Sequence, residues 1–247
     1  MCPLLRSELT KALTLPSILV TALAALVVPP ALAFVTGLSF RPADSRWDDF
    51  PVESHGFEVA GFGQPLIILL AALVIGTEFA DHQLRTSVTA VPDRRRLLVA
   101  KLAVVTGAAA LIGAVATSAA VLLKHAALGE HGLPVSEFTT AMAGNLLGVV
   151  VNYVLMAHIA AGLTILARSV IAPLVVLVPM VLGLTIGLVP AIPALKYSPD
   201  LAGVQLLTGY PGMGLLEPLP GGLVMAAWAA AISLIAAIAW GRRDVSG

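Results

Sequence analysis

The sequence is poor in charge and in cysteine. Asp, Glu, Lys and Arg together make up 11% of the 247 residues, whereas soluble domains average about 25%. A water-soluble fold of this length could not cover its surface with so few charges, and 58% of the residues are hydrophobic, so lipid must be the covering solvent. Cys2 is the only cysteine, which excludes an intramolecular disulfide and a cysteine metal cluster. The formal net charge is zero, so we expect no nucleic-acid partner.

Motifs that would supply chemistry are also missing. The phosphate-cradling loop of nucleotide-binding proteins needs a glycine before its lysine, and none of the four lysines follows a glycine. There is no H-E-x-x-H zinc motif and no G-x-S-x-G nucleophile motif. His125 and His131, which we place in an outer loop, have a spacing that does not favour a shared metal ion. We therefore expect no enzyme, no metal site and no cofactor held by this chain itself.

Six long apolar segments dominate what is present. A membrane-spanning helix needs about 20 mostly apolar residues, and the segments that qualify are 15–38, 62–79, 97–123, 139–167, 170–189 and 221–240. Pro29 and Pro30 are expected to kink the first segment or to end it early. Only Arg168 and Ser169 separate the fourth and fifth, which predicts a tight helical hairpin. The predicted fold is an all-α membrane domain of six spans that covers residues 1–247.

The basic residues predict the orientation of this bundle. With the N-terminus inside, ten of the fourteen Lys and Arg residues lie on the cytoplasmic side, as the positive-inside rule requires. The sequence therefore predicts a multi-pass protein of the plasma membrane with both termini in the cytoplasm.

The first 13 residues are amphipathic and too polar to span. Leu5 and Leu9 recur at helical spacing, while Arg6 and Lys11 take another side, with Glu8 between them. Such a helix would lie along the cytoplasmic interface of the membrane. The alternative is a basic anchor that only fixes the topology of the first span.

The loop between the second and third spans carries the most specific pattern. Glu78 and Asp81 stand near the end of the second span, and Pro92 breaks the chain. Asp93 can cap the next helix, whose first residues are Arg94, Arg95 and Arg96. Residues 81–91 could form a short polar helix that a soluble partner recognises. The alternative is a charged turn that fixes topology.

The order of these features resembles the permease subunits of ABC-2 type transporters. The matching residues are Gly76, Glu78, Leu84, Arg85, Thr86, Pro92, Arg94, Arg96 and Lys101. The resemblance implies six spans and a cytoplasmic coupling helix, here residues 83–91, that docks on an ATPase subunit. The implied docking residues are Glu78, Asp81, Gln83, Leu84, Arg85, Thr86, Asp93, Arg94, Arg95 and Arg96. It also implies ATP and Mg bound by that separate ATPase, a homodimer or a heterodimer with a similar permease, and export.

Two further regions of the sequence carry expectations. Residues 190–220 are long, apolar and rich in Pro and Gly, so we expect short broken helices that re-enter the bilayer before the sixth span, rather than a loose surface loop. In the fourth span, Asn145, Gly148 and Asn152 share one helical face. Small and amide residues favour close helix packing and interhelical hydrogen bonds, and contact with a transport pathway is the alternative. His158 is a lone histidine in the same span.

Two other classes of function remain open on the sequence alone. A non-transporting anchoring or assembly protein could use the same loop to hold a cytoplasmic partner. A proton- or sodium-coupled carrier is disfavoured, because no carboxylate lies in the middle of any predicted span.

Overall fold

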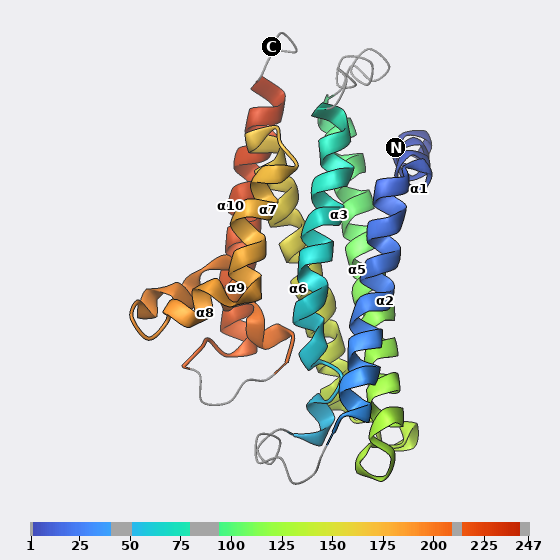
Figure 1. Ribbon diagram of the computed structural model, residues 1–247. Coiled ribbons are helices and arrows are strands. Elements are labelled where there is room, and N and C mark those ends of the chain that lie inside the picture. The colour runs from blue at the N-terminus through green and yellow to red at the C-terminus, as the bar shows by residue number, and fades with distance from the viewer. Residues whose placement is uncertain (1, 41–50, 80–93, 209–213, 243–247) are drawn as a thin grey trace.

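The computed structural model describes residues 2–40, 51–79, 94–208 and 214–242. Every regular element in these ranges is helical, and six helical segments are long and apolar enough to cross a membrane. The segments run side by side along one direction (Figure 1). The predicted all-α fold with six spans is confirmed. Both ends of the chain lie at one end of the bundle (Figure 1), which we call the inner end; the opposite end is the outer end.

The spans are built from ten helical elements of different kinds. The first span is α2 (Pro16–Leu38), and the second joins η2 (Glu58–Gly63), α3 (Gln64–Gly76) and η3 (Thr77–Phe79). The third is α5 (Arg94–Leu128) and the fourth is α6 (Thr140–Ala167). The fifth comprises α7 (Ile171–Pro179), the π-helical turn η6 (Met180–Leu184) and α8 (Thr185–Leu188), and the sixth is α10 (Pro218–Arg242).

Short helices precede the first span or lie in the connections between spans. They are α1 (Cys2–Thr14), η1 (Val52–Ser54), η4 (Gly129–His131), η5 (Val135–Glu137), η7 (Pro193–Tyr197), α9 (Pro199–Ala202) and η8 (Val204–Leu206). The last three lie in the region where the sequence predicts broken helices before the sixth span.

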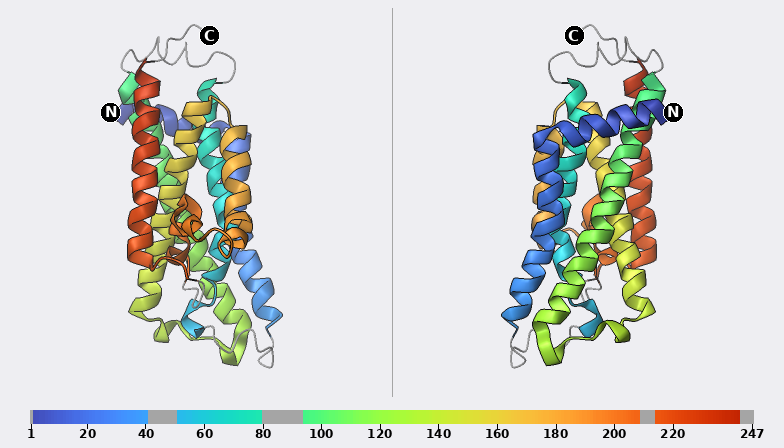
Figure 2. Two further views of the ribbon diagram at one scale, coloured as in Figure 1. Left: turned by 90° about the vertical axis from the view of Figure 1, so that its left-hand side faces the viewer. Right: turned by 90° about the vertical axis from the view of Figure 1, so that its right-hand side faces the viewer.

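The proline pair in the first span bends the helix without ending it. α2 continues through Pro29 and Pro30 to Leu38, and its outer half tilts outward from the bundle axis (Figure 2) while it stays packed on α5, where Thr36 accepts a hydrogen bond from Lys124. A proline ring removes one backbone hydrogen bond and crowds the preceding turn, which favours a bend. Both prolines are buried, so the packing around them supports the helix through the bend.

The third span is longer than its apolar run. α5 extends to Leu128, so Lys124 and His125 lie inside the helix and are buried, and the placement of His125 in an outer loop was wrong. The Lys124 ammonium lies 2.9 Å from a carboxylate oxygen of Glu58 and donates a hydrogen bond to Thr36 Oγ1. An apolar run shows where a helix can cross hydrocarbon, but it does not show where the helix ends. Here α5 continues past its apolar run because Lys124 finds charged and polar partners. His131 lies in η4 and is exposed.

The fourth and fifth spans form the predicted hairpin. α6 ends at Ala167, and Arg168 adopts a left-handed conformation with φ 51° that turns the chain into α7. The fifth span is then interrupted at Gly183, whose φ of 114° breaks the helical geometry inside η6. Such a φ is open to glycine at little cost because glycine lacks a Cβ.

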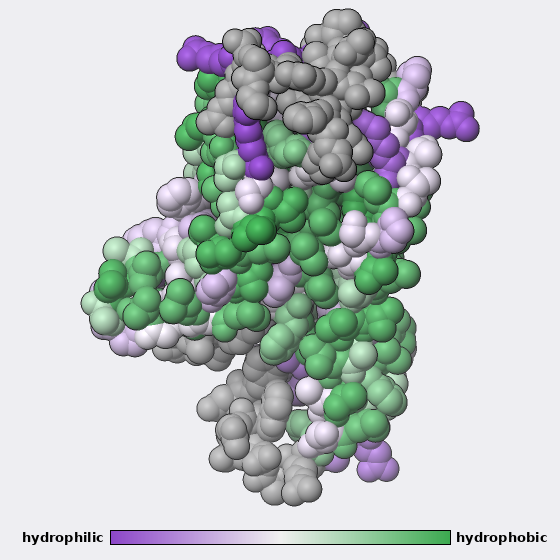
Figure 3. Space-filling view, turned by 45° about the horizontal axis from the view of Figure 1, so that its top comes forward, coloured by the Kyte–Doolittle hydropathy of each residue, from purple (hydrophilic) through white to green (hydrophobic). Residues whose placement is uncertain are grey.

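The first helix lies across the bundle. α1 crosses the inner end nearly at right angles to the spans and then turns into α2 (Figure 2). Hydrophilic side chains gather at this end, and hydrophobic ones cover the sides of the bundle below it (Figure 3). This distribution suits a bundle whose sides face hydrocarbon.

Candidate functional site

The α1 helix has three distinct faces. Leu5, Leu9 and Leu13 are 41–58% exposed and form an apolar stripe, as a helix resting on a lipid surface requires. On the adjacent side, Glu8 is buried against the bundle at 4% exposure. Between them lies a polar face that includes Arg6 and is exposed. The predicted amphipathic helix is therefore present, with a third side that packs on the spans.

A cluster of four charges holds α1 to the spans. Lys101 Nζ in α5 lies 2.6 Å from Glu8 Oε2 and 2.9 Å from Glu78 Oε1. Lys11 Nζ lies 3.0 Å from Glu8 Oε1 and 3.5 Å from Glu78 Oε1. The side chains of Lys101, Glu8 and Glu78 are at most 4% exposed. We call these four residues the inner charge cluster; it joins α1, η3 and α5 with two charges of each sign.

The electrostatics of the inner charge cluster keep Glu8 and Lys11 ionised. Burial alone would raise the pKa of the Glu8 carboxyl, but the charges of Lys101 and Lys11 and the hydrogen bonds they donate outweigh burial and hold that pKa below its ordinary value. For Lys11, burial works to lower the pKa, but the two carboxylates outweigh it and the pKa is raised. The ion pair between Glu8 and Lys11 is therefore intact at neutral pH.

This cluster stands at the base of the loop that carries the predicted coupling helix. η3 ends at Phe79 and α5 begins at Arg94. Six of the predicted docking residues lie outside the described residues: Asp81, Gln83, Leu84, Arg85, Thr86 and Asp93. Arg95 and Arg96 are exposed at the start of α5, and Arg94 is half-buried. Glu78 is buried in the cluster, so any part it takes in docking is through the ion pairs.

One tryptophan contacts both ends of this loop. The indole N–H of Trp240, near the end of α10, donates to the carbonyl oxygen of Arg94 at 3.0 Å. The same indole meets the ring of Phe79 edge-on, with centroids 6.0 Å apart, and is 7% exposed. The two chain ends that flank residues 80–93 are thus fixed to the sixth span.

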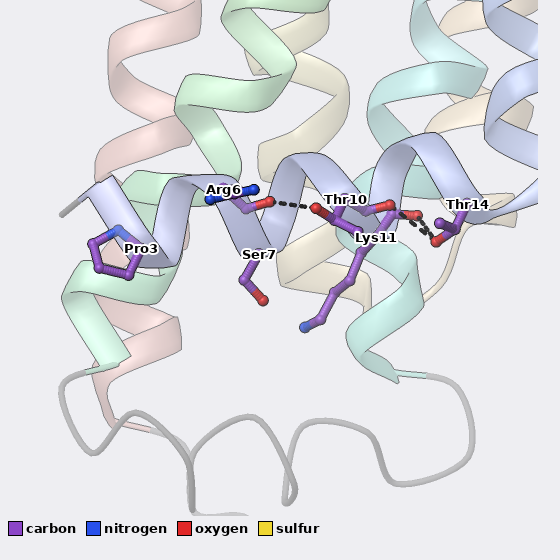
Figure 4. A pocket seen from close by; sticks show the side chains of 6 residues that line it. All are labelled: Pro3, Arg6, Ser7, Thr10, Lys11 and Thr14. Atoms are coloured by element: carbon purple, nitrogen blue, oxygen red, sulfur yellow. Dashed lines mark hydrogen bonds between the residues drawn. The ribbon is translucent and has the colours of Figure 1, made fainter.

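A hollow lies along the polar face of α1. Its volume is about 670 Å³, and its lining residues in the described chain are Pro3, Arg6, Ser7, Thr10, Lys11 and Thr14. The side chains of Ser7 and Lys11 extend into this space, while the hydroxyls of Thr10 and Thr14 bond back to the helix backbone (Figure 4). Polar groups on a helix at the base of the loop provide a surface that a soluble protein can contact.

The three predicted residues of the fourth span hold the segment before the sixth span. Asn145 Nδ2 donates to the carbonyl of Leu207 at 3.0 Å, and Asn152 Nδ2 donates to the carbonyl of Gly203 at 2.8 Å. A Cβ added to Gly148 would lie 2.5 Å from the carbonyl oxygen of Leu206. Asn152 also accepts a bond from Gln64 of α3. All three residues therefore contact the segment 203–207, which reaches the middle of α6 at Asn152.

Comparison with known proteins places the chain in a family. The model of a family described as ABC-2 family transporter protein matches residues 4–185. The chain belongs to this family. No curated protein matches the sequence. The chain is therefore a multi-pass permease of an ABC transporter, and permeases of this family associate with an ABC ATPase. This result favours transport over the anchoring and carrier alternatives.

Sequence reasoning missed the contacts of two residues at the permease's inner end. Lys101 lies inside an apolar segment, and a lysine at such a depth requires a charged partner; that signal could have led to Glu8 or Glu78. Trp240 sits where interfacial tryptophans are common, and nothing in the sequence indicates that it contacts Phe79 and Arg94. Both contacts join segments far apart in the chain.

Proposed function

We propose that this permease is the membrane subunit of an exporter powered by an ATPase in a separate chain. Two copies of the permease, or one copy with a similar partner, form the pathway in the plasma membrane, with both termini cytoplasmic. Each copy engages an ATPase that binds ATP and Mg. The absence of a nucleotide-binding loop from these 247 residues supports a separate ATPase, and the family resemblance implies the export direction.

The observation that carries the proposal is the link between α1 and the base of the 80–93 loop. Lys101 is bound to Glu8 of α1 and to Glu78 at the start of the loop. An ATPase that pushes on either segment therefore pushes on the other and on α5. Because three of the four charges are buried, separating them is costly, and the segments move as one unit. The polar hollow along α1 gives the ATPase a second contact.

The proposal is tested by charge reversal at the inner end. The permease is purified with its ATPase, and Arg85→Glu and Arg94→Glu are compared with wild type for co-purification and ATPase activity. Arg168→Glu is the matched control, because Arg168 also lies at the inner end but in the α6–α7 hairpin. We expect the first two variants to lose association or coupled activity and the control to keep both. Equal behaviour of all three variants would contradict docking at this loop.

A further inference from the structure

A cavity of about 360 Å³ opens between α5 and α6 in their outer halves. Its wall is apolar except for the hydroxyls of Ser118 and Thr139, and the other lining residues include Phe57, Phe138, Met142, Ala143 and Leu146. Ligand sites in proteins have volumes of about 300–1,000 Å³ and mostly apolar walls with a few polar groups. The cavity fits this description, and it lies at the opposite end of the bundle from the inner charge cluster.

The two hydroxyls of the cavity differ in the hydrogen bonds that they make within the protein. Thr139 Oγ1 accepts the backbone N–H of Met142 at the start of α6, and its O–H remains able to donate to a ligand. The hydroxyl of Ser118 makes no hydrogen bond to the described residues. A ligand therefore meets two hydroxyls in an otherwise apolar wall, that of Thr139 at the outer end of α6 and that of Ser118 deeper along α5. This suits a molecule with a long aliphatic part and a small hydrogen-bonding group.

The position of the cavity indicates where that molecule comes from. Leu147, next to Leu146 on α6, is 63% exposed, and Val115 on α5 is 50% exposed, so both helices present apolar side chains outward around the opening. Leu146 is about 9 Å along α6 from the helix start at 1.5 Å per residue, so the cavity begins near the helix end and runs inward. A chain that enters from the outer surface of a bilayer would follow this course. A helix, about 10 Å wide, is too large for the volume.

We propose that this cavity binds one aliphatic chain of a membrane amphiphile, with its ester or hydroxyl group at Thr139, the lining hydroxyl nearer the outer end. The proposal is independent of the proposed ATPase, because none of the lining residues belongs to the inner end. Met142, Phe57 and Phe138 favour contact with an aliphatic chain. The flexible methionine side chain adapts to an irregular ligand, and the aromatic rings supply large apolar contact area.

The test uses the full-length permease in phosphatidylcholine vesicles that contain a phosphatidylcholine with a diazirine in its acyl chain. After irradiation, adducts are mapped by peptide mass spectrometry, and lipid retained after transfer to detergent is counted by native mass spectrometry. We expect one retained lipid per chain and adducts concentrated at residues 118–122 and 142–146. Adducts spread equally over Leu111 and Leu147, with no retained lipid, would overturn the proposal.

Variants that fill the cavity distinguish an aliphatic chain bound in it from the lipid that surrounds the whole bundle. Ala143→Phe and Ser118→Phe place a ring in the cavity from either helix, and both are expected to lose the retained lipid. Ala141→Phe adds the same ring at an exposed position of α6 that does not line the cavity, and should keep it. Variants are compared only if their thermal unfolding midpoints match that of the control, and retention by both filled variants would overturn the proposal.

A second part of the experiment identifies the molecule that supplies the aliphatic chain. Retention of phosphatidylcholine identifies an ordinary bilayer lipid as the occupant. Retention of a different chain-bearing amphiphile from a total membrane extract, in preference to phosphatidylcholine, identifies a dedicated ligand. Retention of neither contradicts the site.

Discussion

Trp240 donates its indole N–H to the carbonyl oxygen of Arg94 at 3.0 Å, joining the inner end of the sixth span to the first residue of α5. Because Phe79 packs on the same indole, both ends of the loop that carries the predicted coupling helix are held by one side chain. A force applied to this loop therefore reaches α10 directly. The outer part of α10 packs against α9 and η8, which continues the connection toward the outer end of the permease.

Replacing Trp240 by phenylalanine should weaken this connection. The change removes the hydrogen bond to Arg94, worth about 0.5–1.5 kcal/mol, and keeps an aromatic ring beside Phe79. We expect a complex that still forms but whose ATPase activity responds less to the permease. The measurement is the ratio of ATPase activity with and without the permease.

Trp228→Phe is the matched control for this prediction. Trp228 is on the same helix, and its indole N–H also donates to a backbone carbonyl, that of Tyr197 at 2.9 Å, but outside the inner end. Loss of this hydrogen bond should leave the ratio of ATPase activity with and without the permease unchanged. An equal loss of coupling in both variants would mean that α10 stability, rather than the contact with the loop, controls activity.

Lys101 should be the most costly residue of the inner charge cluster to remove. Lys101→Met leaves Glu8 and Glu78 buried beside each other with only Lys11 near them, and loss of one partner from a buried ion pair costs about 3–5 kcal/mol. We expect a large fall in the thermal unfolding midpoint in detergent. Lys11→Met is the control: its side chain is 40% exposed, and exposed pairs contribute about 1 kcal/mol or less. Equal midpoints for the two variants would contradict this ranking.

The sequence predicts the spans well because each depends on a local property, the length of an apolar run. It places α6 at 139–167, and the helix is Thr140–Ala167. The inner charge cluster depends on residues 8, 78 and 101 meeting in space, and no local pattern carries that information. Glu78 illustrates the difference: its position before a basic loop indicates a surface residue, whereas its carboxylate is buried against Lys101.

Asn152 should contribute more than Asn145 to holding the segment before the sixth span. Asn152→Leu leaves the amide of Gln64 and the carbonyl of Gly203 without this partner in a buried site, and each such group costs about 1–3 kcal/mol. Asn145→Leu removes one partly buried bond, to Leu207. The reactivity of a cysteine introduced at Gln205 reports release of the segment from α6. We expect this reactivity to rise more in Asn152→Leu than in Asn145→Leu. The opposite order would show that the bonds to Gln64 and Gly203 do not hold the segment.

Acid should destabilise the outer end through His55. Burial lowers the pKa of His55, and Lys124 and His125 lower it further, although Glu58 opposes them. The folded chain therefore keeps the ring neutral, while the unfolded chain takes up a proton below about pH 6.5. Stability from this group is complete above that pH and is lost as the pH falls below it.

Unfolding midpoints at pH 7 and pH 5 test this sign. His55→Gln should reduce the difference between the two midpoints, because the group that titrates is gone. His131→Gln, at an exposed position, should leave the difference as in wild type. A wild-type midpoint that rises on acidification would contradict the predicted direction.

The break in the fifth span should require glycine at one position only. Gly183 has a φ of 114°, and a side chain held in such a conformation costs about 1–3 kcal/mol. Gly183→Ala should therefore lower the unfolding midpoint or straighten the helix, even though the nearest atom to an added Cβ is 3.9 Å away. Gly187, four residues on in α8, has helical geometry and open space around an added Cβ, so Gly187→Ala should stabilise by about 0.5–1 kcal/mol. Because the two substitutions add the same methyl group to the same span, opposite signs would assign the effect to the backbone, and equal signs would show that the break does not depend on Gly183.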